Sequence, residues 1–269
     1  MRIDAHHHMW EPARRPQQWL DEPDMEPIRR DFPLNDFPAT GIDRTVLVQV
    51  LPDVEETREF LAAAAASDLV AGVVGWADLT AGSLPDLDGP LVGIRHLVQG
   101  EADAAWLNRP DVRRGLRAVA DAGLAYDLLT LPHQLPAAIE TVHALPELTF
   151  VLDHLSKPPI ATGELEPWAT LIRRLAAAPN VYCKLSGLVT EAGKDWTVSD
   201  LRPYADVALD AFGPSRIMYG SDWPVCLLAA TYDQVLETAG ELTTHLTPAE
   251  REDVFGGTAL RAYGLDAFS

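Results

Sequence analysis

Short runs of β-branched and apolar residues alternate along the chain with longer stretches of helical periodicity, and the alternation repeats about eight times. Several runs are apolar at almost every position, as strands of a parallel sheet are when both faces are buried. The predicted strands are residues 2–7, 44–50, 70–76, 91–96, 125–129, 149–153, 181–185 and 217–220. The predicted helices between them are residues 55–66, 111–122, 135–144, 167–178, 201–212 and 232–241.

Eight strands with helical spacers predict an α/β fold of the (β/α)8 TIM barrel type, in which the functional residues lie at the C-terminal ends of the strands. A doubly wound open sheet is the alternative. That fold usually carries a Gly-rich phosphate loop after its first strand, and here the position holds His-His-His-Met-Trp at 6–10. A length of 269 residues suits one barrel domain over residues 1–269, since no linker divides the chain.

Two segments interrupt the alternation. Residues 9–40 are rich in proline and charge and predict an extended loop over the barrel mouth. That loop either wraps the rim of the barrel or covers a substrate, and the sequence leaves both roles open. Near the end of the chain, Thr-Pro-Ala-Glu at 247–250 has the pattern of a capping box with proline at the first helical position, so it predicts a closing helix.

The net charge of −19, from 40 acidic and 21 basic residues, argues against nucleic-acid or anionic-membrane partners, because such a surface repels phosphate. No apolar run approaches the roughly 20 residues that a membrane-spanning helix needs. Two cysteines form no disulfide framework, and no secretory leader is recognisable. We therefore expect a cytoplasmic protein with a small-molecule substrate, and a homo-oligomer is compatible with the sequence.

Histidines and acids gather at the predicted strand ends. In an extended strand, side chains alternate between faces, so His6 and His8 project together while His7 points the other way. Two converging imidazoles can hold a metal such as zinc or steer a substrate oxygen. His154 and Asp222 stand at two further strand ends, and such groups are costly to bury unless they are paired or coordinated. The other polar residues at these ends are Gln49, Asp78, Arg95, His96, Asp127, Asp153, Lys184, Ser186 and Ser221.

Five motifs in order carry a family resemblance: Asp-Ala-His-His-His-Met-Trp at 4–10, Gly-Ile-Arg-His at 93–96, Leu-Asp-His-Leu-Ser-Lys-Pro-Pro at 152–159, Cys-Lys-Leu-Ser-Gly-Leu at 183–188 and Tyr-Gly-Ser-Asp-Trp-Pro-Val at 219–225. The chain resembles the amidohydrolase superfamily (amidohydrolase family 2) almost end to end. More narrowly, it is similar to the branch that contains sugar-lactone hydrolases such as L-fuconolactonase and L-rhamnonolactonase, with 2-pyrone-4,6-dicarboxylate lactonase a more distant relative. The resemblance implies a barrel in which His6, His8, His154 and Asp222 meet.

These residue types can carry out hydrolysis at a carbonyl carbon, and the resemblance implies that the carbonyl is that of a lactone. Asp222 can take a proton from the attacking water and later deliver it to the leaving ring oxygen, while imidazoles such as that of His154, or a bound metal, polarise the carbonyl. Arg95 and Lys184 are expected to hold substrate hydroxyls or a carboxylate, with salt bridges to barrel acids as the alternative. The remaining expected substrate contacts are His96, Trp76 and Trp223, each of which has a core-packing alternative.

The resemblance also bears on the metal. Binuclear members of the superfamily use a bridging Lys or Glu at the end of the fourth strand, where this chain has Arg95, which stays charged and cannot ligate. We therefore expect at most one divalent metal per chain, Zn2+ if any, held by His6, His8, His154 and Asp222. A metal-free site is left open. A decarboxylase of a related type and a barrel that binds a ligand without catalysis are the alternative functions.

Overall fold

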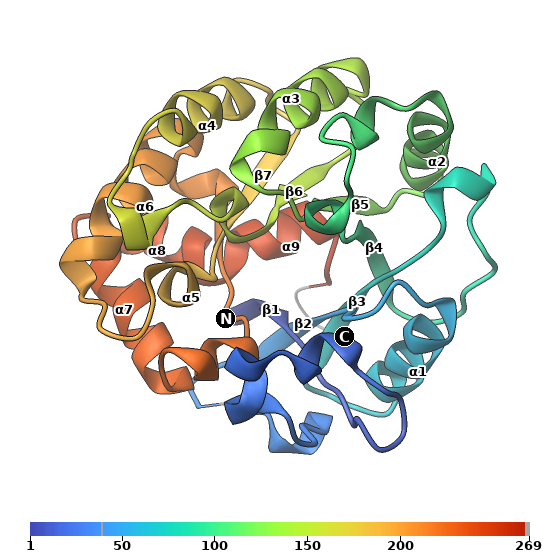
Figure 1. Ribbon diagram of the computed structural model, residues 1–269, viewed down its shortest axis with the longest axis horizontal. Coiled ribbons are helices and arrows are strands. Elements are labelled where there is room, and N and C mark those ends of the chain that lie inside the picture. Colours follow the sequence, from blue (N-terminus) through green and yellow to red (C-terminus); the bar gives the residue numbers. More distant parts are fainter. Residues whose placement is uncertain (39, 267–269) are drawn as a thin grey trace.

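Eight parallel strands form a single barrel in the computed structural model, which describes residues 1–38 and 40–266. Each strand pairs with the next one along the chain, in the order β1 to β8. The strands occupy the middle of the molecule and helices surround them (Figure 1). They are β1 Ile3–His7, β2 Arg44–Val48, β3 Val70–Gly75, β4 Leu91–His96, β5 Ala125–Leu128, β6 Phe150–Leu152, β7 Val181–Leu185 and β8 Ile217–Tyr219.

The barrel closes where the ends of β1 and β8 meet. The backbone N–H of His8 donates to the carbonyl of Trp223 at 2.7 Å, and the N–H of Asp222 donates to the carbonyl of His6 at 2.8 Å. These two bonds join the first and last strand ends, so the sheet has no open edge there. The prediction of a (β/α)8 barrel is confirmed, and the open doubly wound sheet is excluded.

The helices are α1 Val54–Ala65, α2 Pro110–Asp121, α3 Leu135–Ala144, α4 Trp168–Ala176, α5 Leu188–Ala192, α6 Val198–Phe212, α7 Tyr232–Leu242, α8 Pro248–Glu252 and α9 Thr258–Tyr263. The predicted capping box opens α8, where the side chain of Thr247 accepts from the N–H of Glu250. The closing element is more complex than one helix, because a π-helical turn, Asp253–Gly257, joins α8 to α9. The short α5 has no counterpart among the predicted helices.

Two separate cores hold the barrel together. The larger core lies between the strands and the surrounding helices. The smaller one fills the barrel interior, where Val46, Val48 and Val74 pack with Ala259 and Tyr263 of α9. Because α9 and these side chains fill one end of the barrel, open space for a ligand is confined to the other end, where the strands finish.

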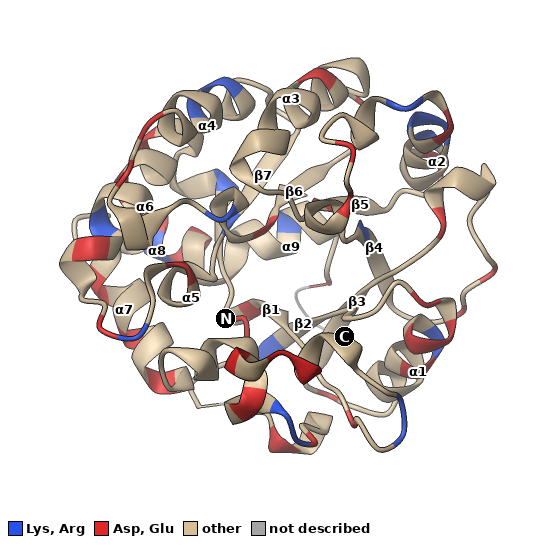
Figure 2. Ribbon diagram, viewed as in Figure 1, with Lys and Arg blue, Asp and Glu red and all other residues tan. Residues whose placement is uncertain are grey.

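In its described part, the segment between β1 and β2 contains three short 3-10 helices, Gln18–Asp21, Pro23–Ile28 and Leu34–Asp36. Trp10 anchors the segment, since its backbone exchanges two hydrogen bonds with Phe32 and its indole N–H donates to Arg30 O at 3.0 Å. Acidic residues lie along this segment and on the outer helices (Figure 2). Within residues 1–38 and 40–266, no helix has the length and apolar character needed to cross a membrane.

Candidate active site

A bulge in β1 aims its histidines into the barrel. The pairing register between β1 and β2 shifts between Asp4 and His7, which is a common way for a strand next to a site to redirect a side chain. His6 and His8 face each other with their Nε2 atoms 3.2 Å apart. His7 points away and bonds to Thr45 Oγ1 at 2.9 Å, so the expected alternation along this strand is found.

His154, which follows β6, and Asp222, which follows β8, join this pair. Oδ1 of Asp222 lies 3.4 Å from Nε2 of His8, 3.7 Å from Nε2 of His6 and 3.8 Å from Nε2 of His154. His6, His154 and Asp222 each offer one ligand atom within 4.8 Å of the others. All four side chains are at most 6% exposed, so little water competes for them.

A left-handed turn after β6 presents His154. Residues 154–157 have φ angles of 51°, 52°, 58° and 50°, and none of them is glycine. A left-handed residue costs about 1–2 kcal/mol, so the surrounding structure must hold this turn. Trp168 Nε1 donates to the carbonyl of Leu155 at 2.8 Å, and Ser156 Oγ donates to the carbonyl of Thr130 at 3.2 Å. These two hydrogen bonds to the protein core therefore hold the turn in its left-handed conformation.

Gly187 leaves the space that the His154 ring occupies. It has a φ of +68°, and a Cβ built on it would lie 2.7 Å from Cγ and Nδ1 of His154. Only glycine meets both requirements without displacing the ring. The ring is also held by a 2.8 Å hydrogen bond between its Nδ1 and Ser186 Oγ.

The ring nitrogens that face the centre of the cluster are suited to a cation. Nδ1–H of His8 donates to the carbonyl of Val48 at 2.8 Å, because a carbonyl only accepts, so Nε2 carries a lone pair. Nδ1 of His154 is bonded to Ser186, which leaves its Nε2 toward Asp222. Two ligand atoms of a tetrahedral zinc lie about 3.3–3.4 Å apart, given Zn–N bonds of about 2.0–2.1 Å. The separations of 3.2 Å and 3.4 Å around His8 match that spacing, so these residues fit a single divalent ion.

The protonation states agree with this arrangement. Burial lowers the pKa of His154 to about 4, and burial together with the Lys184 ammonium holds the pKa of His6 well below its usual value. Both rings are thus neutral at pH 7. Burial acts to raise the pKa of Asp222. Its interactions with His154, His8 and His6 lower the pKa by more than burial raises it, so the pKa lies below its usual range. The site therefore has an ionised carboxylate beside neutral imidazoles.

A layer of buried charges lies directly beneath the cluster. Lys184 is fully buried, with its Nζ 2.5 Å from Asp127, 2.9 Å from Asp153 and 3.1 Å from Nδ1 of His6. Tyr263 of α9 donates its hydroxyl to Asp127 at 2.8 Å, so the end of the chain is tied to this layer. Lys184 was expected to hold substrate. The structure instead gives it the alternative arrangement, a salt bridge to barrel acids, because its side chain ends inside the barrel below His6.

Arg95 lies between the buried charges and the open end of the barrel. Its Nη1 is 3.0 Å from Asp153 and 3.3 Å from Nε2 of His6, and its Nη2 donates to the carbonyl of Gln49. Its Nε is buried and has no partner among the described residues. Arg95 also lines the main cavity, so it makes a salt bridge and remains available to a ligand.

A cavity of about 750 Å³ opens above the cluster, within the range of small-molecule sites. His8, His154 and Asp222 reach it, whereas His6 lies behind them. Its other lining residues are Trp10, Pro16, Gln18, Trp19, Met25, Val50, Leu51, Pro52, Asp53, Arg95, Leu97, Gln99, Gly100, Leu129, Lys157 and Val225. The segment between β1 and β2 thus both wraps the barrel and contributes to the cavity wall, through Trp10, Trp19 and Met25.

Three residues that we expected to contact substrate lie elsewhere. Trp76 Nε1 donates to Nδ1 of His96 at 3.0 Å, and the His96 ring stacks on Trp106 with centroids 4.3 Å apart. Trp223 is 4% exposed and packs edge-on against Phe32 at 5.3 Å. None of Trp76, His96 and Trp223 is among the residues that line the main cavity, because each side chain is taken up by aromatic packing.

Lys157 and Gln99 line the cavity, although neither was expected there from the sequence. Lys157 follows His154 by three positions in the Leu-Asp-His-Leu-Ser-Lys-Pro-Pro motif, and Gln99 follows β4. The proximity of Lys157 to His154 in the motif was a usable signal. Gln99 had none, because it lies beyond the strand end in a 3-10 turn.

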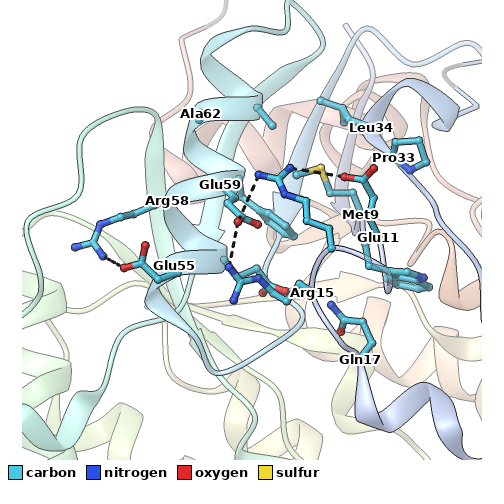
Figure 3. Close-up of a pocket in the computed structure, with 15 residues that line it drawn as sticks. Met9, Glu11, Arg15, Gln17, Pro33, Leu34, Glu55, Arg58, Glu59 and Ala62 are labelled. Atoms are coloured by element: carbon cyan, nitrogen blue, oxygen red, sulfur yellow. Dashed lines mark hydrogen bonds and ion pairs between the residues drawn. The ribbon is translucent and has the colours of Figure 1, made fainter.

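A second cavity of about 550 Å³ lies between α1 and the segment after β1. Figure 3 shows Arg58 beside Glu55 and Arg15 beside Glu59 in this cavity. Its charged groups pair with each other, and none of the four clustered residues lines it. The chemistry therefore belongs to the larger cavity.

The chain is similar to known proteins over nearly its whole length. Residues 3–265 match the family model described as Amidohydrolase. An L-fucono-1,5-lactonase from Burkholderia ambifaria is 40% identical, over 98% of this chain and 96% of its own length, and one from Burkholderia multivorans is 39% identical over the same shares. A crystal structure of a Burkholderia multivorans amidohydrolase with bound zinc has a TM-score of 0.89 and 37% identity, covering 99% of this chain and all of that one. The chain belongs to the amidohydrolase family.

Proposed function

We propose that this protein is a lactone hydrolase that opens a sugar-derived lactone of the L-fucono-1,5-lactone type. The observation that carries the proposal is the cluster of His6, His8, His154 and Asp222, three of which line a cavity of about 750 Å³. Relatives at 39–40% identity over nearly the whole chain are named as L-fucono-1,5-lactonases, which favours this function over a decarboxylase or an inactive binding barrel.

The reaction adds water to the lactone carbonyl and breaks the bond between the carbonyl carbon and the ring oxygen. The ionised carboxylate of Asp222 accepts a proton as the water oxygen attacks. The neutral ring of His154 and the ring of His8 border the same space and orient the reacting oxygens by hydrogen bonding. The proton held by Asp222 then goes to the departing ring oxygen, which becomes a hydroxyl of the product. The new carboxylic acid ionises and releases one proton to solvent.

The donor set supports a single divalent metal, and zinc matches its mixture of imidazole and carboxylate. Such an ion would supply Lewis-acid polarisation of the carbonyl and would lower the pKa of water. His6, His8, His154 and Asp222 would hold it. Arg95, a fixed cation beside His6, opposes a second metal in the same space.

The main test is a pH-indicator assay with aldonolactones of varied ring size and configuration, because each turnover releases a proton. Asp222→Asn is expected to fold normally and to lower kcat by about 10²–10⁴-fold, since an amide cannot accept the proton. Asp78→Asn, at a strand end outside the cavity, is the matched control. Near wild-type turnover by Asp222→Asn would remove Asp222 from the mechanism.

The metal is tested separately. Elemental analysis of protein purified without added metal should give no more than one equivalent per chain, and chelation should reduce activity that zinc restores. Two tightly held equivalents would contradict the one-metal proposal. Full activity of a metal-free sample would limit the cluster to acid-base and hydrogen-bonding roles. A cytoplasmic location and a homo-oligomer stay predictions.

A further inference from the structure

Lys157 reaches the active-site cavity through the same strained turn that presents His154. All four residues from His154 to Lys157 have positive φ, and the N–H of Lys157 donates to the carbonyl of His154 at 2.7 Å. Leu155 and Ser156 are completely buried, while His154 and Lys157 both line the cavity. Consecutive left-handed residues other than glycine persist only where the fold enforces them, and they cluster at functional sites. The turn therefore delivers an ammonium group as well as an imidazole.

Glu191 of α5 balances the charge of Lys157 without occupying its hydrogen bonds. Its Oε1 lies 3.7 Å from Nζ of Lys157, and the two side chains are 27% and 26% exposed. That separation is too long for a hydrogen bond, so the three N–H groups of the ammonium remain able to donate to a ligand.

Two other charges on the cavity wall, those of Arg95 and Asp53, are also paired with opposite charges. Among the described lining residues, the second cation is Arg95, which pairs with Asp153 at 3.0 Å. The acids on the wall are Asp53, which pairs with Arg15, and Asp222. The wall consequently offers hydrogen-bond donors without an excess of positive charge.

We propose that Lys157 binds hydroxyl groups of the substrate and that Glu191, by neutralising Lys157, selects uncharged polyhydroxylated lactones over lactones that carry a carboxylate. The inference rests on the proposed function and adds a selectivity determinant to it. A hydroxyl accepts from the ammonium at no electrostatic cost. A substrate carboxylate at the same position would face the negative charges of Glu191 and Asp222, and specificity arises from such repulsion as well as from attraction.

The test compares two substrates that differ in one group. They are an aldono-1,5-lactone and the 1,5-lactone of the corresponding aldaric acid, in which the exocyclic carbon is a carboxylate. Glu191→Gln leaves the ammonium unneutralised, so kcat/KM for the carboxylated lactone should rise about tenfold while kcat/KM for the neutral lactone changes less than about threefold. Glu166→Gln is the matched control, because Glu166 also lies 3.7 Å from a cation, Arg173, but on the outer surface.

A second variant tests the hydrogen-bonding role of Lys157. Lys157→Asn removes the ammonium and keeps a residue that tolerates the left-handed backbone, so the thermal midpoint should be retained. KM for the neutral lactone should rise about tenfold or more, with a smaller change in kcat, because a hydrogen bond to a charged group is lost.

The outcomes separate the two proposals. A substrate ratio in Glu191→Gln equal to that of wild type, or an unchanged KM in Lys157→Asn, would overturn the role of this pair while leaving the lactonase function intact. Wild-type protein that hydrolyses neither lactone, across a panel of configurations, would instead contradict the proposed function.

Discussion

Replacing Lys184 by methionine should destabilise the protein strongly without weakening substrate binding. The ammonium of Lys184 is fully buried and contacts Asp127 at 2.5 Å and Asp153 at 2.9 Å. Arg95 still pairs with Asp153 in the variant, but among the described residues Asp127 keeps only the Tyr263 hydroxyl as a partner. Removing one member of a buried ion pair typically costs about 3–5 kcal/mol, because the other charge remains uncompensated. That is a large share of a typical unfolding free energy of about 5–15 kcal/mol.

The loss of unfolding free energy in Lys184→Met should become larger as the pH rises. Burial raises the pKa of Asp127 to about 6 even with Lys184 beside it. Without the ammonium, the folded-state pKa of Asp127 should rise further, so folding takes up a proton and stability falls as pH rises toward that pKa. The destabilisation of Lys184→Met should consequently be greater at pH 8 than at pH 5.5. The double variant with Asp127→Asn should recover much of it, since no charge is left unpaired.

Urea unfolding followed by tryptophan fluorescence measures these free energies, and the thermal midpoint should fall by on the order of 10 °C. KM of the folded fraction should stay close to wild type, because Lys184 does not reach the cavity. Lys157→Asn is the control, because it should raise KM and leave the thermal midpoint unchanged. A Lys184→Met protein within about 1 kcal/mol of wild type at pH 8, or a double variant no more stable than the single one, would show that the Lys184–Asp127 ion pair does not stabilise the fold.

Two further predictions concern single residues. Burial raises the pKa of Glu56 from 4.5 to about 7, so the folded protein binds a proton that the unfolded chain releases, and stability falls as pH rises from 4.5 to 7. Glu56→Gln should therefore exceed wild type in unfolding free energy by up to about 3 kcal/mol at pH 8 and by little at pH 4.5, with exposed Glu55→Gln as the control; a constant difference across pH would contradict this. Gly187→Ala and Gly123→Ala both place alanine at a φ near +70°, but only the first meets the His154 ring, at 2.7 Å. Each should lose about 1 kcal/mol, whereas only Gly187→Ala should also lower kcat/KM, by tenfold or more; equal kcat/KM losses in both would remove Gly187 as a positioning residue.

The barrel could be predicted from the sequence because its strands are short, mostly apolar and separated by segments that in most cases have helical periodicity. The predicted 91–96 and 181–185 agree with β4 and β7 as observed. The short α5 was missed because five residues, Leu188–Ala192, carry too little periodicity to be recognised. The π-helical turn before α9 was missed for a related reason, since a single wide turn leaves no repeating signal.

Whether a tryptophan lines the cavity depends on tertiary packing, which cannot be predicted from the sequence. Trp76 and Trp223 follow strand ends, as functional residues do, yet one bonds to His96 and the other packs on Phe32. Trp10 and Trp19 lie in a segment without a strand and nevertheless line the cavity. Position relative to a strand end identifies residues near the mouth of a barrel, but the face on which a side chain leaves the backbone decides whether it reaches the ligand.

Position relative to the end of the strand explains why Lys184 is buried in the barrel whereas Lys157 lines the cavity. Lys184 lies inside β7, one residue before its end, so its ammonium stays within the barrel among acids that neutralise it. Lys157 follows the end of β6 by five residues on a left-handed turn, and its ammonium reaches the cavity. Both belong to motifs of the family and carry the same charge, so residue type alone could not separate them. If this distinction holds, Lys184→Met changes the unfolding free energy and leaves KM alone, whereas Lys157→Asn does the reverse; the same response from both variants would show that strand position does not determine their roles.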